Sequence, residues 1–399
     1  MLERLRLPVA VVGALVVAEV AVLVFRPRDG LDPVAVAPQR YFTAEQIERA
    51  EDFRSGQLAL FGLRLVIELG VLVYVVRRPP SRLRRPFRRP VLAGAGVAAA
   101  ISVALTVAGL PVSAVSRERA KEVGLVTQDW VGWLGDVALG TAIDAVMVGA
   151  GGALLVFGMR RFGRRWWAPA AGLVVAFGVA ITYLSPIVLD PLFNRFEPLP
   201  RGQLRSEVVE LARAAGVDVG EVYEMDASRR TTAANAYVAG LGRTKRVVLY
   251  DTLVRDFERD EVSLVVAHEL GHVNHRDVPR GLLYLAIVAP FGMFAVARLG
   301  ERWAAGPGPA AVPAVVLAVS IMLPAVTAVS NQLSRAVEAR ADRYSLELTG
   351  APRALIDFQR RITIQNVSDP DPPAWSHALF GTHPTAIERI GQALAIEAR

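Results

Sequence analysis

Residues 261–277, EVSLVVAHELGHVNHRD, hold the side chains with the clearest chemical meaning in this sequence. His268 and His272 are four residues apart, so on a helix both imidazoles lie on one face and can bind one Zn²⁺ ion. Glu269, the next residue round the helix, can then accept a proton from a zinc-bound water. A chance match is the alternative, but three of the chain's five histidines fall within eight residues here. The pattern predicts a zinc hydrolase.

A catalytic zinc ion needs a third protein ligand and an open position. His275 comes only three residues after His272 and is followed by Arg-Asp, so we expect it beside the metal site or in solvent. A distant carboxylate is then required, and we choose Glu338 because Asp342 follows it by one helical turn. Glu338 would bind the metal and Asp342 would orient a ligand histidine. Locally, Glu338 fits a surface charge on a charged helix equally well.

The elements that carry these residues lie in an apolar chain, with 53% hydrophobic residues among 399 and no cysteine. The lack of cysteine excludes disulfides and thiolate-bound zinc. A transmembrane helix needs about 20 mostly apolar residues. Seven segments qualify: 7–25, 56–76, 91–113, 135–159, 167–189, 281–299 and 311–330. We therefore expect an integral membrane protein.

Between the fifth and sixth segments the composition is that of a soluble domain. Residues 201–216 predict an amphipathic helix, and three β-like runs follow at 221–226, 234–240 and 245–254, with LGRT (241–244) as the last turn. The zinc helix comes next, with Asp260 as a plausible N-cap. Residues 331–349 read as a polar helix after the seventh span, and a terminal helix begins after His383-Pro384.

These elements define the expected fold class: a mainly α membrane protein with seven transmembrane helices and a small α+β zinc-protease domain. That domain would be formed by the loop before span six together with the C-terminal region. The expected regions are a five-helix membrane region, a catalytic loop domain, a transmembrane hairpin and a C-terminal catalytic region: 1–189, 190–280, 281–330 and 331–399.

Four ionisable residues lie inside the predicted spans: Glu19, Arg64, Glu68 and Asp144. Charged groups in a bilayer are costly and normally face partners or water. Two interpretations stay open. The residues pair with one another, for example Glu19 or Glu68 with Arg64, or they line a hydrated interior.

The net charge of +7 raises the question of a nucleic-acid partner. The arginines, however, concentrate in two short loops beside spans, 77–90 and 160–166, where lipid headgroups and topology explain them better. We expect a lipid bilayer and no nucleic acid. The positive-inside rule would make these loops cytoplasmic, and the zinc region extracytoplasmic, in a bacterial plasma membrane.

Five ordered motifs support a resemblance: DPLFNRFEPL (190–199), MDASRRTTAANAYVAGLGRTKRVVLYDTLV (225–254), HELGH (268–272), SRAVEARAD (334–342) and GTHPTAIERI (381–390). With these motifs the chain resembles the type I CAAX prenyl protease family, integral-membrane gluzincins whose seven transmembrane helices enclose a water-filled chamber. The resemblance covers most of the chain and is densest from residue 190. That family's usual arrangement puts the protease on the cytosolic side, against the arginine distribution, and we favour the charge argument.

The resemblance implies roles for matched positions. Glu338 would be the third ligand of one Zn²⁺ per chain. Asn235 would lie on an edge strand that holds the substrate backbone, and His383 would help to stabilise the tetrahedral oxyanion. Arg335 and Arg389 would brace the site.

The function that follows is an integral-membrane zinc metalloendopeptidase. It would hydrolyse peptide bonds of membrane-associated, hydrophobic or prenylated CAAX-type polypeptides through Glu269-assisted attack of zinc-bound water. Nothing in the sequence reports a prenyl-binding group, so broader cleavage of membrane-associated or misfolded polypeptides is an equal interpretation. The alternative from another class is a non-catalytic membrane chamber that binds or passes hydrophobic peptides. The intact zinc motif with Glu338 argues against it.

Overall fold

The computed structural model describes residues 2–240 and 245–398, most of them in helices. Within these residues seven helices are long and apolar enough to cross a membrane, which confirms the seven predicted spans. They are α1 (Leu2–Phe25), α2 (Ala44–Arg77), α3 (Pro90–Glu122), α4 (Trp130–Phe162), α5 (Trp167–Leu184), α10 (Asp277–Trp303) and α11 (Val312–Thr349).

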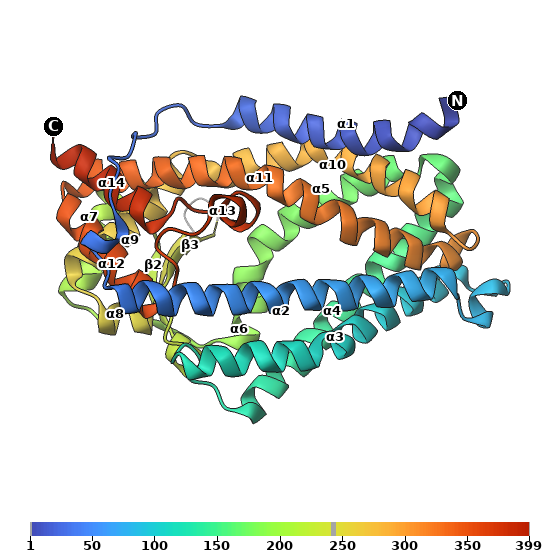
Figure 1. Cartoon of the computed structure of the whole chain (residues 1–399), viewed down its shortest axis with the longest axis horizontal. Coiled ribbons are helices and arrows are strands. Elements are labelled where there is room, and N and C mark those ends of the chain that lie inside the picture. Colours follow the sequence, from blue (N-terminus) through green and yellow to red (C-terminus); the bar gives the residue numbers. More distant parts are fainter. Residues whose placement is uncertain (1, 241–244, 399) are drawn as a thin grey trace.

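The remaining helices and the sheet form a compact unit at one end of the spans, near the C-terminus, while the N-terminus lies at the opposite end (Figure 1). The helices are α6 (Asp190–Phe193), α7 (Gln203–Ala214), α8 (Asp251–Asp256), α9 (Arg259–Asn274), α12 (Pro352–Gln365), α13 (Ala374–Phe380) and α14 (Ala386–Glu397). The expected α+β unit is therefore built from both the loop before the sixth span and the C-terminal region.

The sheet has four strands in the order β1-β2-β4-β3, with β2 and β4 parallel and the outer pairs antiparallel. The strands are β1 (Phe196–Pro198), β2 (Glu221–Met225), β3 (Ala236–Ala239) and β4 (Arg246–Tyr250). All three predicted β-runs contain a strand, and β3 lies at an edge. The short strand β1 was not predicted, and the expected turn at 241–244 lies outside the described residues.

The third β-run was predicted too long, because its last residues form α8. Asp251 at the start of that helix accepts hydrogen bonds from the backbone N–H of Ser228, at 2.8 Å, and from its hydroxyl. This contact with a residue 23 positions away turns the chain out of the sheet, and strand propensity alone does not reveal it.

Helix α9, which carries the zinc motif, is almost entirely buried beside the sheet. Its apolar side chains, Val262, Leu264 and Val266 among them, pack in one core with the strand residues Val222 and Leu249. The predicted N-cap is wrong by two positions: Glu258 caps α9 in a reciprocal capping box with Glu261. Burial on most sides leaves the helix little freedom to move its polar stripe.

The seventh span and the polar segment after it form one helix, α11, of 38 residues rather than two helices. The polar residues continue the helix because one face of it contacts the α+β unit. From Asn331 the side chains on this face bond to loop carbonyls, a histidine and an arginine. A membrane helix thus directly positions part of the site.

The segment between α1 and α2 crosses the α+β unit and lies against α14. The backbone N–H of Val34 donates to the carbonyl of Gly391 at 3.1 Å, and Leu31 and Phe42 are buried. A β-carbon at residue 391 would overlap the Val34 carbonyl oxygen, so glycine is needed for this close approach. The contact holds α14 in place.

Three of the ionisable residues inside the spans, Arg64, Glu68 and Glu19, have polar partners. Arg64 bonds Glu68 at 2.7 Å on the same helix and the Ser113 hydroxyl of α3 at 3.2 Å. Glu19 of α1 accepts from Gln332 of α11 at 3.0 Å. These contacts join α2 to α3 and α1 to α11.

Candidate metal centre and active site

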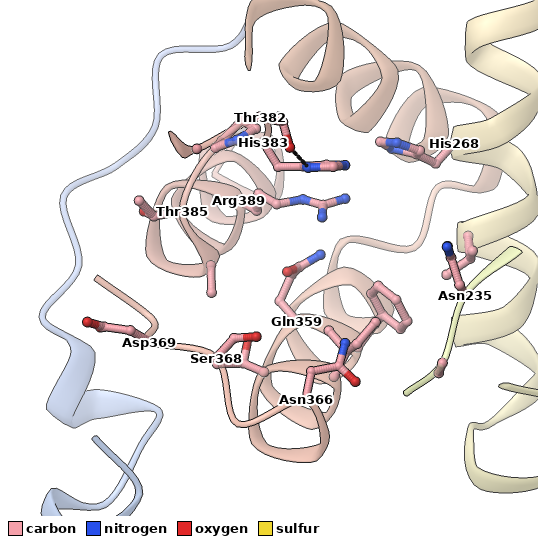
Figure 2. Close-up of a pocket in the computed structure, with 18 of the residues that line it drawn as sticks. Asn235, His268, Gln359, Asn366, Ser368, Asp369, Thr382, His383, Thr385 and Arg389 are labelled. Atoms are coloured by element: carbon pink, nitrogen blue, oxygen red, sulfur yellow. Dashed lines mark hydrogen bonds between the residues drawn. The ribbon is translucent and has the colours of Figure 1, made fainter. Parts of the chain in front are cut away.

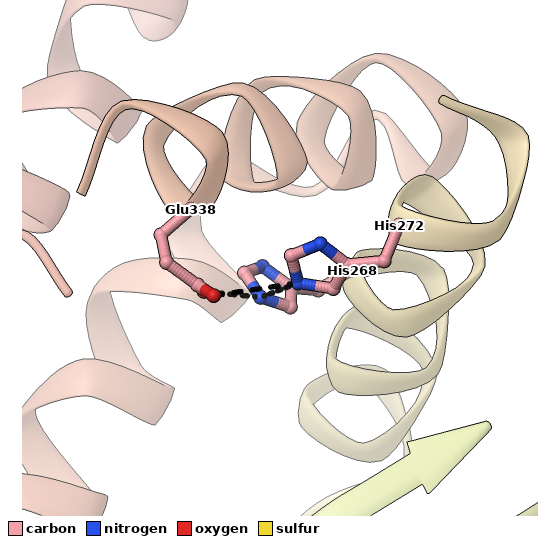
Figure 3. A group of neighbouring side chains, drawn as sticks. All are labelled: His268, His272 and Glu338. Atoms are coloured by element: carbon pink, nitrogen blue, oxygen red, sulfur yellow. Dashed lines mark hydrogen bonds and ion pairs between the residues drawn. The ribbon is translucent and has the colours of Figure 1, made fainter. Parts of the chain in front are cut away.

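Two histidines of α9 and a glutamate of α11 converge on one point (Figure 3). The Nε2 atoms of His268 and His272 are 3.2 Å apart. The Glu338 carboxylate lies 3.1 Å from His268 Nε2 and 3.6 Å from His272 Nε2. The i,i+4 spacing puts both rings on one face of α9, and α11 brings the carboxylate to that face.

Each of the two rings is held from behind by an aspartate. His268 Nδ1 lies 2.8 Å from Asp342 Oδ1, and His272 Nδ1 lies 3.0 Å from Asp277 Oδ2. A carboxylate accepts, so Nδ1 of each ring carries the proton and Nε2 presents a lone pair to the cluster. This is the arrangement by which proteins orient histidine ligands of zinc.

Each aspartate is in turn bound by an arginine. Arg389 of α14 binds both oxygens of the fully buried Asp342, at 2.5 and 2.7 Å, and Arg340 binds Asp277. These charge-assisted hydrogen bonds are about twice as strong as neutral ones, so the orientation of both rings is well determined.

The donor set fits a cation. With protons at Nδ1, two lone pairs and a carboxylate face one another at 3.1–3.6 Å, which is unfavourable unless positive charge lies between them. Without a metal ion, a second proton on each ring would supply this positive charge. Burial opposes charge on the imidazoles, yet bonds to Asp342 and Glu338 raise the pKa of His268 to about 9. Against the same burial, bonds to Asp277 and Glu338 raise the pKa of His272 to about 10. Two imidazole nitrogens and one carboxylate are a typical catalytic zinc set.

The glycine of the zinc motif permits close packing of α9 on α11. A β-carbon at Gly271 would lie 3.1 Å from Cδ1 of Tyr344 on α11, tighter than ordinary contact. His275 follows on the same side, with Nδ1 2.8 Å from the Gly271 carbonyl and its ring 5.4 Å from that of Tyr344. His275 therefore supports the helix contact, and it is absent from the metal cluster.

Glu269 lines a cavity of about 560 Å³ beside the cluster. Burial raises the pKa of its carboxyl group, and among the described residues this side chain has no hydrogen-bond or ion-pair partner. Figure 2 shows Asn235 and His268 on one side of the cavity, facing His383 and Arg389. The cavity thus offers an unpaired carboxyl group next to the metal cluster.

Asn235 immediately precedes the edge strand β3 and is exposed to the cavity. Its side-chain oxygen accepts from the backbone N–H of Ala236 at 2.9 Å, and its carbonyl accepts from Tyr250 N–H at 3.0 Å. The outer side of β3 has no partner strand among the described residues. An extended peptide could pair with this edge.

His383 lies across the cavity, with Nε2 3.3 Å from Glu338 Oε2 and Nδ1 2.9 Å from the Thr382 hydroxyl. Its side chain is 55% exposed. Arg335 lies away from the metal cluster and donates to the carbonyls of His377, at 3.2 Å, and Gly381, at 2.7 Å. The expected bracing residues therefore act at different places, Arg389 on Asp342 and Arg335 on the loop before His383.

Sequence reasoning missed Asp277 and Arg340. The chain reverses between α9 and α10 at Arg276, which adopts a left-handed conformation with φ 55°. Only this turn brings Asp277 back to His272, although the two are five residues apart. An acidic residue shortly after the zinc motif was the available signal.

Comparison with known proteins gives two adjoining family matches. Residues 198–397 match the family described as peptidase family M48. Residues 43–195 match the family described as CAAX prenyl protease N-terminal, five membrane helices.

Individual relatives agree with these matches. An uncharacterised metalloprotease of Bacillus subtilis, YhfN, is 30% identical over 77% of this chain and 74% of its own. A CAAX prenyl protease 1 homolog of rice, Oryza sativa subsp. japonica, is 32% identical over 55% of this chain and 53% of its own. The chain thus spans about half the length of the rice relative. The crystal structure of S. mikatae Ste24p has the same fold, with a TM-score of 0.77 and 18% identity over 98% of both chains.

Proposed function

Because the chain belongs to peptidase family M48 and is an integral-membrane zinc metalloendopeptidase, we propose that it cleaves internal peptide bonds of polypeptides held at the membrane. The observation that carries this proposal is the convergence of His268, His272 and Glu338 beside the unpaired carboxyl group of Glu269. In this proposal the three residues are the zinc ligands.

Bound zinc supplies a Lewis acid that polarises the scissile carbonyl and lowers the pKa of water there. Glu269 takes the proton of the attacking water and returns it to the leaving amine. Its raised pKa suits both steps, because the group must accept a proton and then give it up. Asp342 and Arg389 keep the ring of His268 in orientation throughout.

Two groups on the cavity walls handle the substrate. The edge of β3, with Asn235, binds an extended peptide backbone beside the metal cluster. His383 donates from Nε2 to the oxygen that becomes negatively charged as the carbonyl is attacked. Its position 3.3 Å from Glu338, on the open side of the cluster, supports this role.

The proposed substrates are hydrophobic or lipid-modified polypeptides, with prenylated CAAX tails as one class. Phe380 lines the cavity, and its ring is 5.6 Å from that of Phe61 on the span α2, so the site continues into an apolar surface. The names of the rice and other CAAX prenyl protease relatives favour a prenylated tail. Membrane-associated polypeptides without a lipid fit the same surface.

We propose that residues 190–280 and 331–399 together form the protease unit, since each part supplies a side of the metal cluster. The remaining regions, 1–189 and 281–330, would form the membrane part. The arginine-rich loops 77–90 and 160–166 lie at the other end of the spans, where anionic lipid is a sufficient partner without nucleic acid.

The same arginine loops support a bacterial plasma-membrane location with the protease unit outside the cytoplasm. A reporter that is active only in the cytoplasm, fused after residue 399, is expected to stay inactive. An active reporter contradicts this orientation.

The function is tested on detergent-purified wild type and Glu269→Gln. The panel contains a prenylated CAAX peptide, its unprenylated twin and an unfolded protein. We expect one zinc per chain in both proteins, turnover by the wild type, and a loss of about 10²–10⁴-fold in the variant. Zinc without turnover by the wild type would favour the non-catalytic chamber, and equal activity of the two proteins would remove Glu269 from the mechanism.

A further inference from the structure

The loop that carries His383 is closed by a side chain that the mechanism above does not use. His377 lies in α13, and its ring atom Nε2 is 2.8 Å from the carbonyl oxygen of His383. A carbonyl oxygen only accepts, so the ring N–H donates. The imidazole therefore spans the loop and holds the backbone of the residue that faces the metal cluster.

Gly381 makes room for this ring. A β-carbon at residue 381 would overlap Cδ2 of His377 and would lie 2.7 Å from the His377 carbonyl oxygen. The backbone N–H of Gly381 donates to that same carbonyl at 2.9 Å. Since φ at Gly381 is −73°, the backbone conformation does not demand glycine, and both the imidazole and the backbone carbonyl of His377 exclude a side chain here.

Helix α11 holds the loop from the other side. Arg335 donates to the carbonyls of His377 and Gly381, and Asn331 donates to that of Leu379 at 2.8 Å. Glu338 stands on the same helix, less than one turn beyond Arg335. The end of α13 and Gly381, the first residue of the loop, are thus fixed to the helix that supplies the third side of the metal cluster.

The side chain of His383 itself makes few contacts. Its side chain is exposed, and its imidazole has the Thr382 hydroxyl on Nδ1 and the Glu338 carboxylate near Nε2. If its carbonyl were released, the backbone before Pro384 could turn and carry the ring away from the cluster. A displacement of about 1 Å at a reacting group can cost about 10²-fold in rate.

We propose that His377 is a positioning residue for His383: its ring N–H sets the backbone from which His383 reaches the oxyanion. The proposal rests on the function of His383 proposed above. It also identifies a pair of histidines that divide positioning and catalysis between them: His377, partly buried beside Gly381, and His383, facing the substrate.

Two substitutions of His377 distinguish this role from simple packing. The amide nitrogen of glutamine is the same number of bonds from Cβ as Nε2 of histidine, whereas that of asparagine matches Nδ1. Glutamine can therefore donate to the His383 carbonyl and asparagine is too short. Both are smaller than imidazole and fit beside Gly381, so the two variants are matched except for reach.

The experiment uses the full zinc-loaded chain in detergent, as wild type, His377→Ala, His377→Asn, His377→Gln and His383→Ala. For each protein, kcat, KM, zinc content and the affinity for a phosphinic peptide, a tetrahedral mimic of the attacked carbonyl, are measured. We expect the alanine and asparagine variants to lose about 10–10²-fold in kcat and in affinity for the mimic, with zinc content and KM unchanged. Glutamine is expected to restore most of both.

The outcomes separate this inference from the proposed function. If His383→Ala is impaired and all three variants of His377 equal the wild type, the positioning role of His377 is contradicted and the proposed role of His383 stands. If the alanine, asparagine and glutamine variants of His377 are equally impaired, the positioning role is also contradicted, because packing or folding then explains the loss. His383→Ala equal to wild type contradicts the proposed role of His383. If the wild type lacks turnover, affinity for the mimic still orders the variants and decides the positioning role.

Discussion

The metal side and the substrate side of this site are supported in different ways. The proposed metal ligands His268 and His272 are backed by aspartates, and each aspartate by an arginine, with Asp342 fully buried. The proposed substrate side consists of Asn235 beside an edge strand and of His383 on a loop, both exposed and held mainly through backbone groups and a hydroxyl.

This difference follows from what each side must do. Zinc ligands must hold their geometry through every turnover, and buried charge-assisted bonds provide that rigidity. Groups that contact substrate must stay accessible, so their support comes from the backbone behind them. Substitutions on the metal side should therefore change zinc binding or stability, and those on the substrate side should change turnover with zinc retained.

The largest effect is expected for the third ligand. Glu338→Gln removes the one carboxylate among the three described residues of the cluster, so zinc should be lost on dialysis and activity should fall below detection. Metal analysis before and after dialysis checks it. Glu347→Gln is the matched control, because Glu347 is on the same helix, 52% exposed and paired with Arg343. Full zinc retention by Glu338→Gln would remove Glu338 from the ligand set.

On the substrate side His383→Ala should lower kcat by about 10²–10³-fold, because one donor to the oxyanion is lost. Zinc content should stay at the wild-type value. Steady-state kinetics with metal analysis tests the contrast directly. Zinc loss in this variant would place His383 on the metal side of the comparison.

The two aspartates behind the rings should give smaller effects that differ from each other. Asp342→Asn and Asp277→Asn should each weaken zinc binding by about 10–100-fold, measured by competition with a chelator. Each substitution also leaves a guanidinium without its carboxylate, Arg340 in Asp277→Asn and Arg389 in Asp342→Asn, a loss that costs about 3–5 kcal/mol in buried pairs. Asp342→Asn removes the more deeply buried carboxylate, which Arg389 binds through both oxygens. Its thermal stability should therefore fall further, and unchanged zinc affinity in both variants would contradict the supporting role.

The smallest effect is expected for Asn235→Ala. One hydrogen bond to a peptide contributes about 0.5–1.5 kcal/mol, so KM should rise about 2- to 10-fold with kcat and zinc unchanged. Titration with peptides of increasing length measures it, since the β3 edge adds backbone bonds to longer substrates. A change in kcat alone would move Asn235 from binding to catalysis.

Local patterns in the sequence predicted much of this protein. Seven apolar runs are each long enough for a bilayer, and their length and composition alone define them as spans. The spacing of His268 and His272 predicted that both rings share one face of a helix, because helical geometry is set by the backbone. The proposed zinc site and its proposed general base follow from those few residues.

The tertiary structure alone decided which distant groups meet. Glu338 reaches the cluster because α11 continues unbroken past the seventh span and packs against Gly271, and the left-handed turn at Arg276 returns Asp277 to His272. The ring of His377 likewise meets a carbonyl across its loop, in a position that a side chain at residue 381 would overlap. Such contacts depend on packing between segments far apart in the chain or on the shape of a turn. Neither can be predicted from the hydrophobic periodicity or the composition of the sequence.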